Sequence, residues 1–328
     1  MEQNALRDIL KIDATHEIER LCDFINEQLR VMRRDRIVLG LSGGVDSAVI
    51  AALAVKTAGK ERIAAYILPE KESNPVSLKF AQKQADKLGI FAEVIDLTGV
   101  LEAFGTYRMR DEVIRTVFPE YDETCKAKIT LPRDLLARDA INFFTLEIMN
   151  KKGRRQSRRL SNQQTRGIVA ATDTKQRTRM MHLYYHAEKN NGLVCGTTNK
   201  TEAIQGLFVK YGDGGVDIEP IAHLYKTQVY QLALALDVIP EIIARTPSPD
   251  TFSDPVSDEE FFFRMPYSVL DLLLYAWEQQ MPVNEVGKAL GLTEEQVRRS
   301  FRDFSGKYNV SRHLRQLPPT PVYIEGNK

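Results

Sequence analysis

Short apolar runs alternate with amphipathic stretches along the first hundred residues. The run at residues 36–41 is rich in β-branched side chains and ends at a glycine-rich turn, after which residues 46–58 continue with helical spacing. A second strand, a helix and a third strand are expected at residues 62–68, 77–88 and 91–97. Alternation of this kind predicts a parallel sheet that is covered by helices on both faces.

The same pattern resumes after residue 170. Apolar positions at helical spacing predict a helix at residues 174–188, and residues 192–196 form a fourth candidate strand. The last third of the chain has the periodicity of helices, which are expected at residues 226–236, 267–279, 283–290 and 294–304. The predicted fold class is therefore α/β, with a doubly wound parallel sheet and a helical C-terminal part.

No internal repeat or low-complexity linker divides the chain. We therefore expect a single domain over residues 1–328, with a segment inserted at residues 105–167 and a helical part with a tail at residues 265–328. Its 328 residues and 43% hydrophobic content are those of an ordinary globular protein. The longest apolar run, residues 48–55, is far shorter than a membrane helix, and no secretory signal is recognisable, so we expect a cytoplasmic protein without membrane contact.

Charge is concentrated in the inserted segment. The whole chain has a formal net charge of +1, but residues 105–170 contain 14 basic and 8 acidic side chains. Six of the nine residues at 151–159 are cationic, a density that attracts phosphates or nucleic acid. A strand-like run precedes this segment, which itself begins with Lys-Lys-Gly, a sequence typical of a turn, so we favour an exposed hairpin tip.

A glycine-rich loop separates the first strand from its helix, at Ser42-Gly43-Gly44-Val45-Asp46-Ser47. In a doubly wound sheet ligands bind at this end of the strands, and two adjacent glycines let successive backbone amides point at one anion. The loop matches neither the Walker P-loop nor the dinucleotide fingerprint. A carboxylate beside a phosphate site needs a cation between them, which suggests that Asp46 is a Mg²⁺ ligand. The alternative is a simple turn in which Asp46 caps the helix.

This loop resembles the pyrophosphate loop of the ATP pyrophosphatases, and three further segments narrow the resemblance. Residues 196–202 (GTTNKTE), 208–221 (FVKYGDGGVDIEPI) and 224–229 (LYKTQV) resemble the NAD synthase family, and the likeness covers residues 15–100 and 168–322 in order. It implies a Rossmann-like sheet of the adenine nucleotide alpha-hydrolase type. It also implies ATP- and Mg²⁺-dependent amidation of deamido-NAD⁺ (nicotinic acid adenine dinucleotide) by ammonia through an acyl-adenylate, with release of AMP and pyrophosphate.

The resemblance assigns roles to individual residues. Those expected to bind ATP are Gly40, Leu41, Ser42, Gly43, Gly44, Val45, Asp46, Ser47, Thr197, Lys226 and Ser248. Those expected to hold the dinucleotide substrate are Arg177, Lys210, Asp217 and His313. Asp46 and Glu202 are expected to bind Mg²⁺, and Asp46, Lys226 and Ser47 to take part in catalysis. The enzyme is expected to be a homodimer, and ammonia to be free or supplied by a separate glutaminase.

Three features depart from the family pattern. The loop at residues 69–77 lacks the usual acidic motif, residues 105–170 exceed the usual connection by some tens of residues, and Leu314 stands where a lysine normally follows the histidine at 313. These departures leave open an adenylating ligase for a different carboxylate.

Two other functions compete with this interpretation. A tRNA-modifying ATP pyrophosphatase would use the same loop, but its sulfur-transfer members need paired reactive cysteines, and Cys22, Cys125 and Cys195 have no such spacing. Residues 283–304 resemble a DNA-binding helix-turn-helix, although Val297, Phe301 and Phe304 have the spacing of a core-facing stripe. We expect no nucleic-acid partner.

Overall fold

A four-stranded parallel sheet forms the centre of the molecule in the computed structural model, which describes residues 6, 8–132, 134–137 and 142–321. Its strand order is β3-β2-β1-β7, and all neighbouring strands are parallel. The predicted doubly wound sheet is confirmed, although the third strand is shorter than expected. The strands are β1 (Arg36–Gly40), β2 (Ile63–Ile67), β3 (Ala92–Val94) and β7 (Gly192–Val194).

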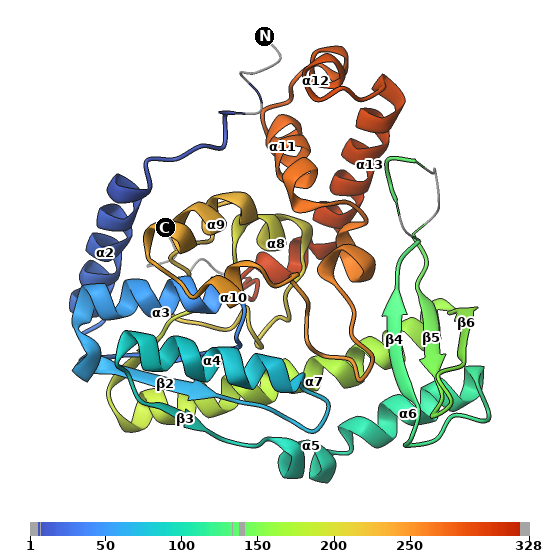
Figure 1. Cartoon of the computed structure of the whole chain (residues 1–328), viewed down its shortest axis with the longest axis horizontal. Coiled ribbons are helices and arrows are strands. Elements are labelled where there is room, and N and C mark those ends of the chain that lie inside the picture. Colours follow the sequence, from blue (N-terminus) through green and yellow to red (C-terminus); the bar gives the residue numbers. More distant parts are fainter. Residues whose placement is uncertain (1–5, 7, 133, 138–141, 322–328) are drawn as a thin grey trace.

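Helices cover both faces of this sheet (Figure 1). Successive side chains of β1 point to opposite faces of the sheet, so Ile37 and Leu39 are buried in one hydrophobic cluster and Val38 in another. The first cluster includes side chains of α2 (Ala14–Val31), α3 (Val45–Ala58), α4 (Pro75–Leu88) and α9 (Lys226–Ala235). The second includes side chains of α5 (Thr98–Phe104), α6 (Thr106–Val117) and α7 (Asn162–Lys189).

The inserted segment folds as α6 and a separate antiparallel sheet, with strands β4 (Lys126–Thr130), β5 (Thr145–Met149) and β6 (Arg155–Arg159). The expected hairpin is confirmed, because β5 and β6 are joined by a turn in which the amide of Asn150 donates to the carbonyl of Arg154. Gly153 adopts a φ of 75° there, a conformation that glycine accommodates without strain. The basic run is therefore the turn and the edge strand of this sheet.

The C-terminal part is helical, as predicted. Short helices α8 (Lys200–Gln205) and α10 (Pro240–Ile243) precede a π-helix at Glu259–Phe263, and a 3₁₀ turn follows at Arg312–Arg315. Another 3₁₀ turn, at Lys60–Arg62, precedes β2 in the first part of the chain. The longer helices are α11 (Tyr267–Glu278), α12 (Val283–Leu290) and α13 (Glu294–Ser311), which share a third hydrophobic cluster.

Helices α12 and α13 bury apolar side chains in the hydrophobic core. Val297 and Phe304 of α13 have no exposed surface, and Phe301 packs against the same cluster. This arrangement matches the core-facing stripe predicted from the sequence. No helix in the described ranges is both long enough and apolar enough to cross a membrane.

Candidate functional site

The glycine-rich loop makes a tight turn at the carboxyl end of β1. Gly43 has a φ of 76°, and a Cβ at this position would lie 2.3 Å from the carbonyl oxygen of Ser77. The hydroxyl of Ser47 donates to the carbonyl of Gly44 (3.0 Å) and accepts from the amide of Ser42 (3.2 Å). Gly44 is the N-cap residue of α3 and supplies no side-chain acceptor. The first turn of α3 therefore presents backbone donors and the positive end of its dipole to an anion.

Three charged side chains meet beside this loop. Nζ of Lys226 lies 2.6 Å from Oδ2 of Asp46 and 3.0 Å from Oε1 of Glu202. Each comes from the first turn of its own helix: α3 for Asp46, α8 for Glu202 and α9 for Lys226. Asn199 caps α8 and donates from Nδ2 to Oδ1 of Asp46 at 3.0 Å. Asp46 is thus not the helix cap, and its cationic neighbour in this structure is Lys226.

Burial and neighbouring charges determine the protonation of this cluster. Burial raises the pKa of Glu202 to about 8, and the nearby carboxylates of Asp46 and Asp258 act in the same direction against the attraction of Lys226. Burial alone would lower the pKa of Lys226, but Asp46, Glu202 and Asp258 outweigh it and raise that pKa well above its ordinary value. Lys226 is therefore cationic at neutral pH.

Asp258 is a third carboxylate near Lys226 that the sequence analysis did not find. Burial raises its pKa, and the hydroxyl of Tyr267 donates to its Oδ2 at 2.8 Å. It lines the same cavity as the cluster, just before the π-helix at Glu259–Phe263. No sequence motif identifies Asp258, because the path of a loop, rather than local sequence spacing, brings it close to Lys226.

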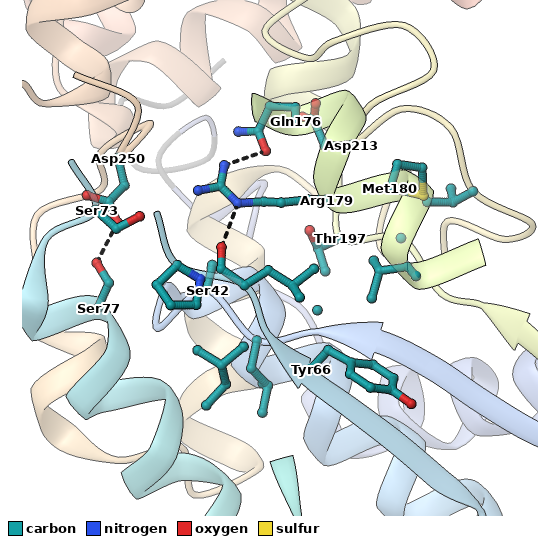
Figure 2. A pocket seen from close by; sticks show the side chains of 18 of the residues that line it. Ser42, Tyr66, Ser73, Ser77, Gln176, Arg179, Met180, Thr197, Asp213 and Asp250 are labelled. Carbon is teal, nitrogen blue, oxygen red and sulfur yellow. Dashed lines mark hydrogen bonds between the residues drawn. The ribbon is translucent and has the colours of Figure 1, made fainter. Parts of the chain in front are cut away.

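A first cavity, of about 170 Å³, lies between the ends of β1 and β2 and helix α7. Of the predicted residues, Gly40, Leu41, Ser42 and Thr197 line it. Figure 2 shows Tyr66, Gln176, Arg179 and Met180 around it, with Nε of Arg179 donating to the carbonyl of Leu68 at 3.1 Å. The cavity is small and its wall is mostly apolar, as is typical of a pocket for a small molecule.

A second and larger cavity, of about 590 Å³, adjoins the first. Both are bordered by Ser42, Gln176, Thr197, Asp213 and Asp250. The predicted residues that the structure brings to the second cavity are Ser42, Gly44, Val45, Asp46, Ser47, Arg177, Thr197, Glu202, Lys210, Lys226 and Ser248. The pocket beside the sheet and the cavity that holds the charged cluster therefore lie next to each other.

Two predicted substrate residues do not line either cavity. The carboxylate of Asp217 forms hydrogen bonds outside the cavities: it accepts from the hydroxyl of Tyr184 (3.1 Å) and from the amide of Val194 (2.7 Å). His313 is exposed on the 3₁₀ turn, and only its carbonyl contacts a site residue, by accepting from Nζ of Lys210 at 3.0 Å. Leu314 lines the cavity instead. Gly43 also lies outside the lining, where it shapes the loop.

Several polar residues of the cavities were not identified from the sequence. Arg245 donates from Nη2 to Oγ of Ser77 (2.8 Å) and from Nη1 to the carbonyl of Gly43 (3.2 Å), which places a guanidinium beside the glycine-rich loop. Burial raises the pKa of both Asp173 and Asp213 to about 6. Asp213 belongs to a recognised segment that gave it no role, whereas Asp173 and Arg245 had no signal in the sequence.

Known proteins resemble this chain in sequence and in fold. The NAD synthase family model matches residues 17–129 and 110–318. The NH(3)-dependent NAD(+) synthetase of Mesorhizobium japonicum is 41% identical over 96% of this chain and 99% of its own. The structures of NMN synthetase from Francisella tularensis (TM-score 0.66, 23% identity) and of NH3-dependent NAD synthetase from Campylobacter jejuni (0.63, 22%) each align with 95% of this chain and all of their own, and share the fold. The chain belongs to the NAD synthase family.

Proposed function

We propose that this chain is an ammonia-dependent NAD⁺ synthetase, which converts the carboxylate of deamido-NAD⁺ to an amide at the expense of ATP. The observation that carries the proposal is the meeting of Asp46, Glu202 and Lys226 beside the glycine-rich loop, next to two cavities of about 170 and 590 Å³ that share lining residues. Full-length similarity to proteins named NH(3)-dependent NAD(+) synthetases supports this assignment.

The reaction needs activation because a carboxylate has no leaving group that ammonia can displace. A carboxylate oxygen of the substrate attacks the α-phosphorus of ATP, and pyrophosphate leaves. Ammonia then attacks the acyl carbon, loses a proton and expels AMP. The protein supplies alignment and charge neutralisation rather than a nucleophile. The loop amides and the hydroxyls of Ser42 and Ser47 would bind the departing pyrophosphate, with Lys226 as a positive charge beside it.

Mg²⁺ is part of this proposal, and the donor set fits it. Asp46 and Glu202 direct carboxylate oxygens at one point, now held by Nζ of Lys226, and carboxylates are the ligands that Mg²⁺ prefers. Across the described ranges no group of three or more His, Cys, Asp or Glu residues could hold a metal by itself. Phosphate oxygens of ATP would therefore complete the shell. When bound, the ion would neutralise charge that develops on pyrophosphate.

Two further parts of the proposal concern partners. Ammonia would be the nitrogen source, free or delivered by a separate glutaminase. The enzyme would act as a homodimer, and the support for this is a group of exposed apolar side chains near edge strand β3 and on α7. The group comprises Phe91, Val94, Met181 and Tyr185.

The deciding experiment measures pyrophosphate release and NAD⁺ formation from Mg-ATP and ammonia, with and without deamido-NAD⁺. We expect release that depends on the dinucleotide, with one NAD⁺ formed per pyrophosphate. A nicotinate mononucleotide serves as the matched acceptor without the adenylate half. No NAD⁺ from protein that still binds ATP would contradict the proposal and favour another carboxylate as acceptor.

Replacement of Glu202 by Gln tests the metal site. The amide keeps the shape of the side chain but cannot become the carboxylate that Mg²⁺ prefers as a ligand, so NAD⁺ formation at limiting Mg²⁺ should fall about tenfold or more. The control is Glu188→Gln, which changes an exposed carboxylate of α7. Equal Mg²⁺ dependence of the two variants would remove Glu202 from the metal shell.

A sulfur-transfer function receives no support from the cysteines. Cys195 is buried in the core of the sheet, where burial raises the pKa of its thiol and keeps it protonated. Cys125 packs against a different hydrophobic cluster, under the antiparallel sheet. The two thiols therefore do not form a reactive pair.

A further inference from the structure

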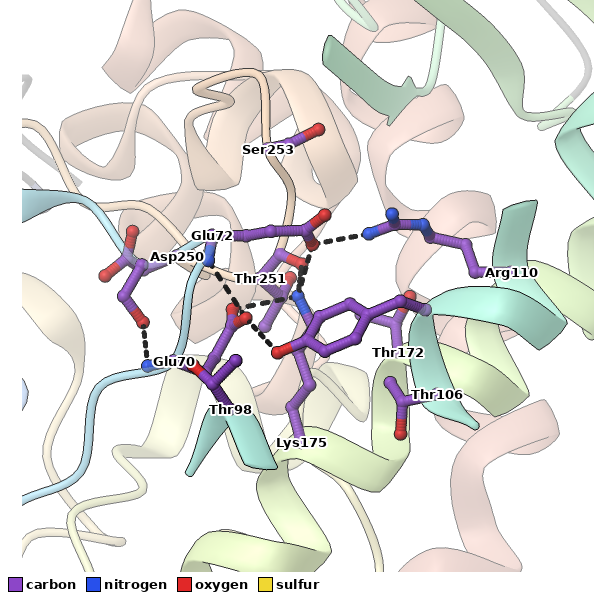
Figure 3. A network of polar contacts seen from close by, with 12 residues as sticks. Glu70, Glu72, Thr98, Thr106, Arg110, Thr172, Lys175, Asp250, Thr251 and Ser253 are labelled. Atoms are coloured by element: carbon purple, nitrogen blue, oxygen red, sulfur yellow. Dashed lines mark hydrogen bonds and ion pairs between the residues drawn. The ribbon is translucent and has the colours of Figure 1, made fainter. Parts of the chain in front are cut away.

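Lys175 is a buried cation that none of the steps above uses. It lies in the middle of α7 with 1% of its surface exposed. Its ammonium donates to Oε1 of Glu70 (2.9 Å), Oε2 of Glu72 (2.7 Å) and the carbonyl of Thr251 (2.8 Å). All three of its donors are thus occupied, as Figure 3 shows.

Helix α6 of the inserted segment completes this network. The hydroxyl of Tyr107 donates to Oε2 of Glu70 at 2.7 Å, and the guanidinium of Arg110 forms an ion pair with Glu72. Arg110 also donates to Asp111 from Nε (2.9 Å) and Nη2 (2.7 Å). Burial would raise the pKa of Glu72, but the charges of Lys175 and Arg110 outweigh it, so that the pKa is lowered and the carboxylate stays ionised. The network is therefore a charged one, and each ion has a partner.

The three acceptors of Lys175 belong to two loops that border the phosphate region. The loop at residues 69–74 supplies Glu70 and Glu72 and leads into α4. The loop at residues 245–257 supplies Thr251, and its Arg245 donates to the carbonyl of Gly43 in the glycine-rich loop. Asp250 links the two loops directly, since it accepts from the amide of Asn74 (3.1 Å) and from Oγ of Ser77 (2.7 Å).

Other contacts hold the second loop, since Phe252 and Val256 are buried against the antiparallel sheet and the amide of Ala127 donates to Oγ of Ser253 at 2.9 Å, but these contacts do not involve the first loop. Neither loop contains a strand, and the hydrogen bonds between them involve partly exposed groups. A buried lysine that satisfies one acceptor in the second loop and two in the first ties them to the rigid helix behind. Loss of Lys175 would leave Glu70 as a buried carboxylate without its cationic partner, which strongly disfavours this arrangement of the loops.

We propose that Lys175 is a positioning residue, which together with Tyr107 and Arg110 of the inserted segment holds both loops closed over the phosphate site before ATP binds. This inference rests on the proposed function, and it gives the inserted segment a role in the adenylation half of the reaction. Preorganisation of this kind lowers the entropy loss on nucleotide binding, so it acts mainly on the KM for ATP.

The test uses two variants of the full chain. Lys175→Met removes the ammonium but leaves Glu70 and Glu72 in place, and it risks misfolding. The combination of Lys175→Met with Glu70→Gln also removes one carboxylate, while Glu72 keeps Arg110 as its partner. The matched control is Lys189→Met, which changes an exposed lysine at the end of the same helix.

We expect the double variant to raise the KM for ATP about tenfold or more, with kcat within about threefold of the parent. Amide hydrogen exchange of residues 69–77 and 245–257 should become about tenfold faster without ligand, return towards the parent rate at saturating ATP, and stay unchanged in β1 and β2. Lys189→Met should match the parent in both measurements.

Two results would overturn the proposal. One is a folded double variant whose KM for ATP and loop exchange equal those of the parent. The other is loss of protection throughout the sheet in both variants, which would make the network a support of the core. Hydrogen exchange does not depend on catalysis. If the parent protein forms no NAD⁺ but the loops of the double variant still exchange faster than those of the parent, the proposed function alone is refuted.

Discussion

At the scale of single residues, Gly43 shows why the loop needs glycine at that position. Its φ of 76° is costly for other residues, and a Cβ would lie 2.3 Å from a backbone oxygen that has little room to move. Gly59 has the same φ of 76° but open space around its Cβ position. A comparison of the two positions therefore distinguishes the cost of backbone strain, which both share, from the cost of steric overlap, which only Gly43 has.

We predict that Gly43→Ala lowers the free energy of unfolding by about 2 kcal/mol or more, whereas Gly59→Ala lowers it by only about 1 kcal/mol. The first variant should also raise the KM for ATP, because relief of the overlap requires movement of the loop. Chemical denaturation and steady-state kinetics measure the two effects. Equal losses of stability in the two variants would show that the overlap has no influence.

Asp213 allows a prediction about pH. Burial raises its pKa to about 6 from an ordinary value of 3.8, although its backbone hydrogen bonds and the charges of Arg179 and Arg177 oppose this. The folded protein therefore holds a proton that the unfolded chain releases above pH 4. The resulting stability is full below pH 4 and is lost as pH rises through about 6.

Replacement of Asp213 by Asn removes this titration. Between pH 4 and pH 6 the free energy of unfolding of the variant should gain on that of the parent by up to about 3 kcal/mol. Urea denaturation across this range measures the difference, with Asp23→Asn, an exposed residue of α2, as the control. A constant difference between variant and parent would mean that the carboxyl is not shifted.

Among the residues of the site, those within ordered motifs were predictable. Asp46, Glu202 and Lys226 were assigned before their contact was known, because each lies in a recognisable segment. Asp258, Arg245 and Asp173 were missed, since they reach the cavities through the course of loops and one helix face. Asp217 and His313 belong to recognised segments, yet their side chains lie outside the cavity lining.

At the scale of elements, α7 differs most from its predicted form. The helix spans Asn162–Lys189, whereas apolar spacing indicated only residues 174–188. Its first half carries few apolar positions, so periodicity could not reveal it. A capping box between Ser161 and Gln164 marks the true start. The extra turns bring the helix beside the inserted segment, where Ile168 joins the cluster under the antiparallel sheet.

The antiparallel sheet has its own hydrophobic cluster, which includes Leu146 of β5 and also Phe252 and Val256 of the loop at residues 245–257. We predict that Leu146→Ala lowers the free energy of unfolding by about 2–5 kcal/mol and makes that loop more sensitive to limited proteolysis. The control, Leu234→Ala, changes a side chain that is 67% exposed and should have an effect of less than about 1 kcal/mol. Unchanged cleavage of the loop in Leu146→Ala would show that the packing of the sheet does not stabilise the loop.

At the scale of the whole molecule, the cavities are lined by residues at the carboxyl ends of parallel strands, by α7 and by the loop at residues 245–257. Opposite faces of the sheet have different surroundings. Phe91, directly before edge strand β3, is 82% exposed, and Tyr185 on α7 is 58% exposed. Apolar side chains in such a position are typical of an interface between subunits.

We therefore predict that the protein has the mass of two chains in light scattering. The combination of Phe91→Asp with Tyr185→Asp should yield a single chain, because it places charges within the apolar face. Leu234→Asp, on α9, should leave the mass unchanged. A parent protein with the mass of one chain would contradict the homodimer, as would a doubly substituted protein that keeps the mass of two.

The sequence by itself determined the order of the main strands and helices outside the inserted segment, the sharp turn after β1 and the family, because periodicity and motifs act over a few residues. It also marked the carboxylates and the lysine of the charged cluster. Tertiary structure alone decided that Lys226 lies between Asp46 and Glu202, that Asp217 bonds to a backbone amide, and that Lys175 joins two loops. The physical reason is that burial and charge pairing depend on contacts between residues distant in the chain, and local patterns do not encode these contacts.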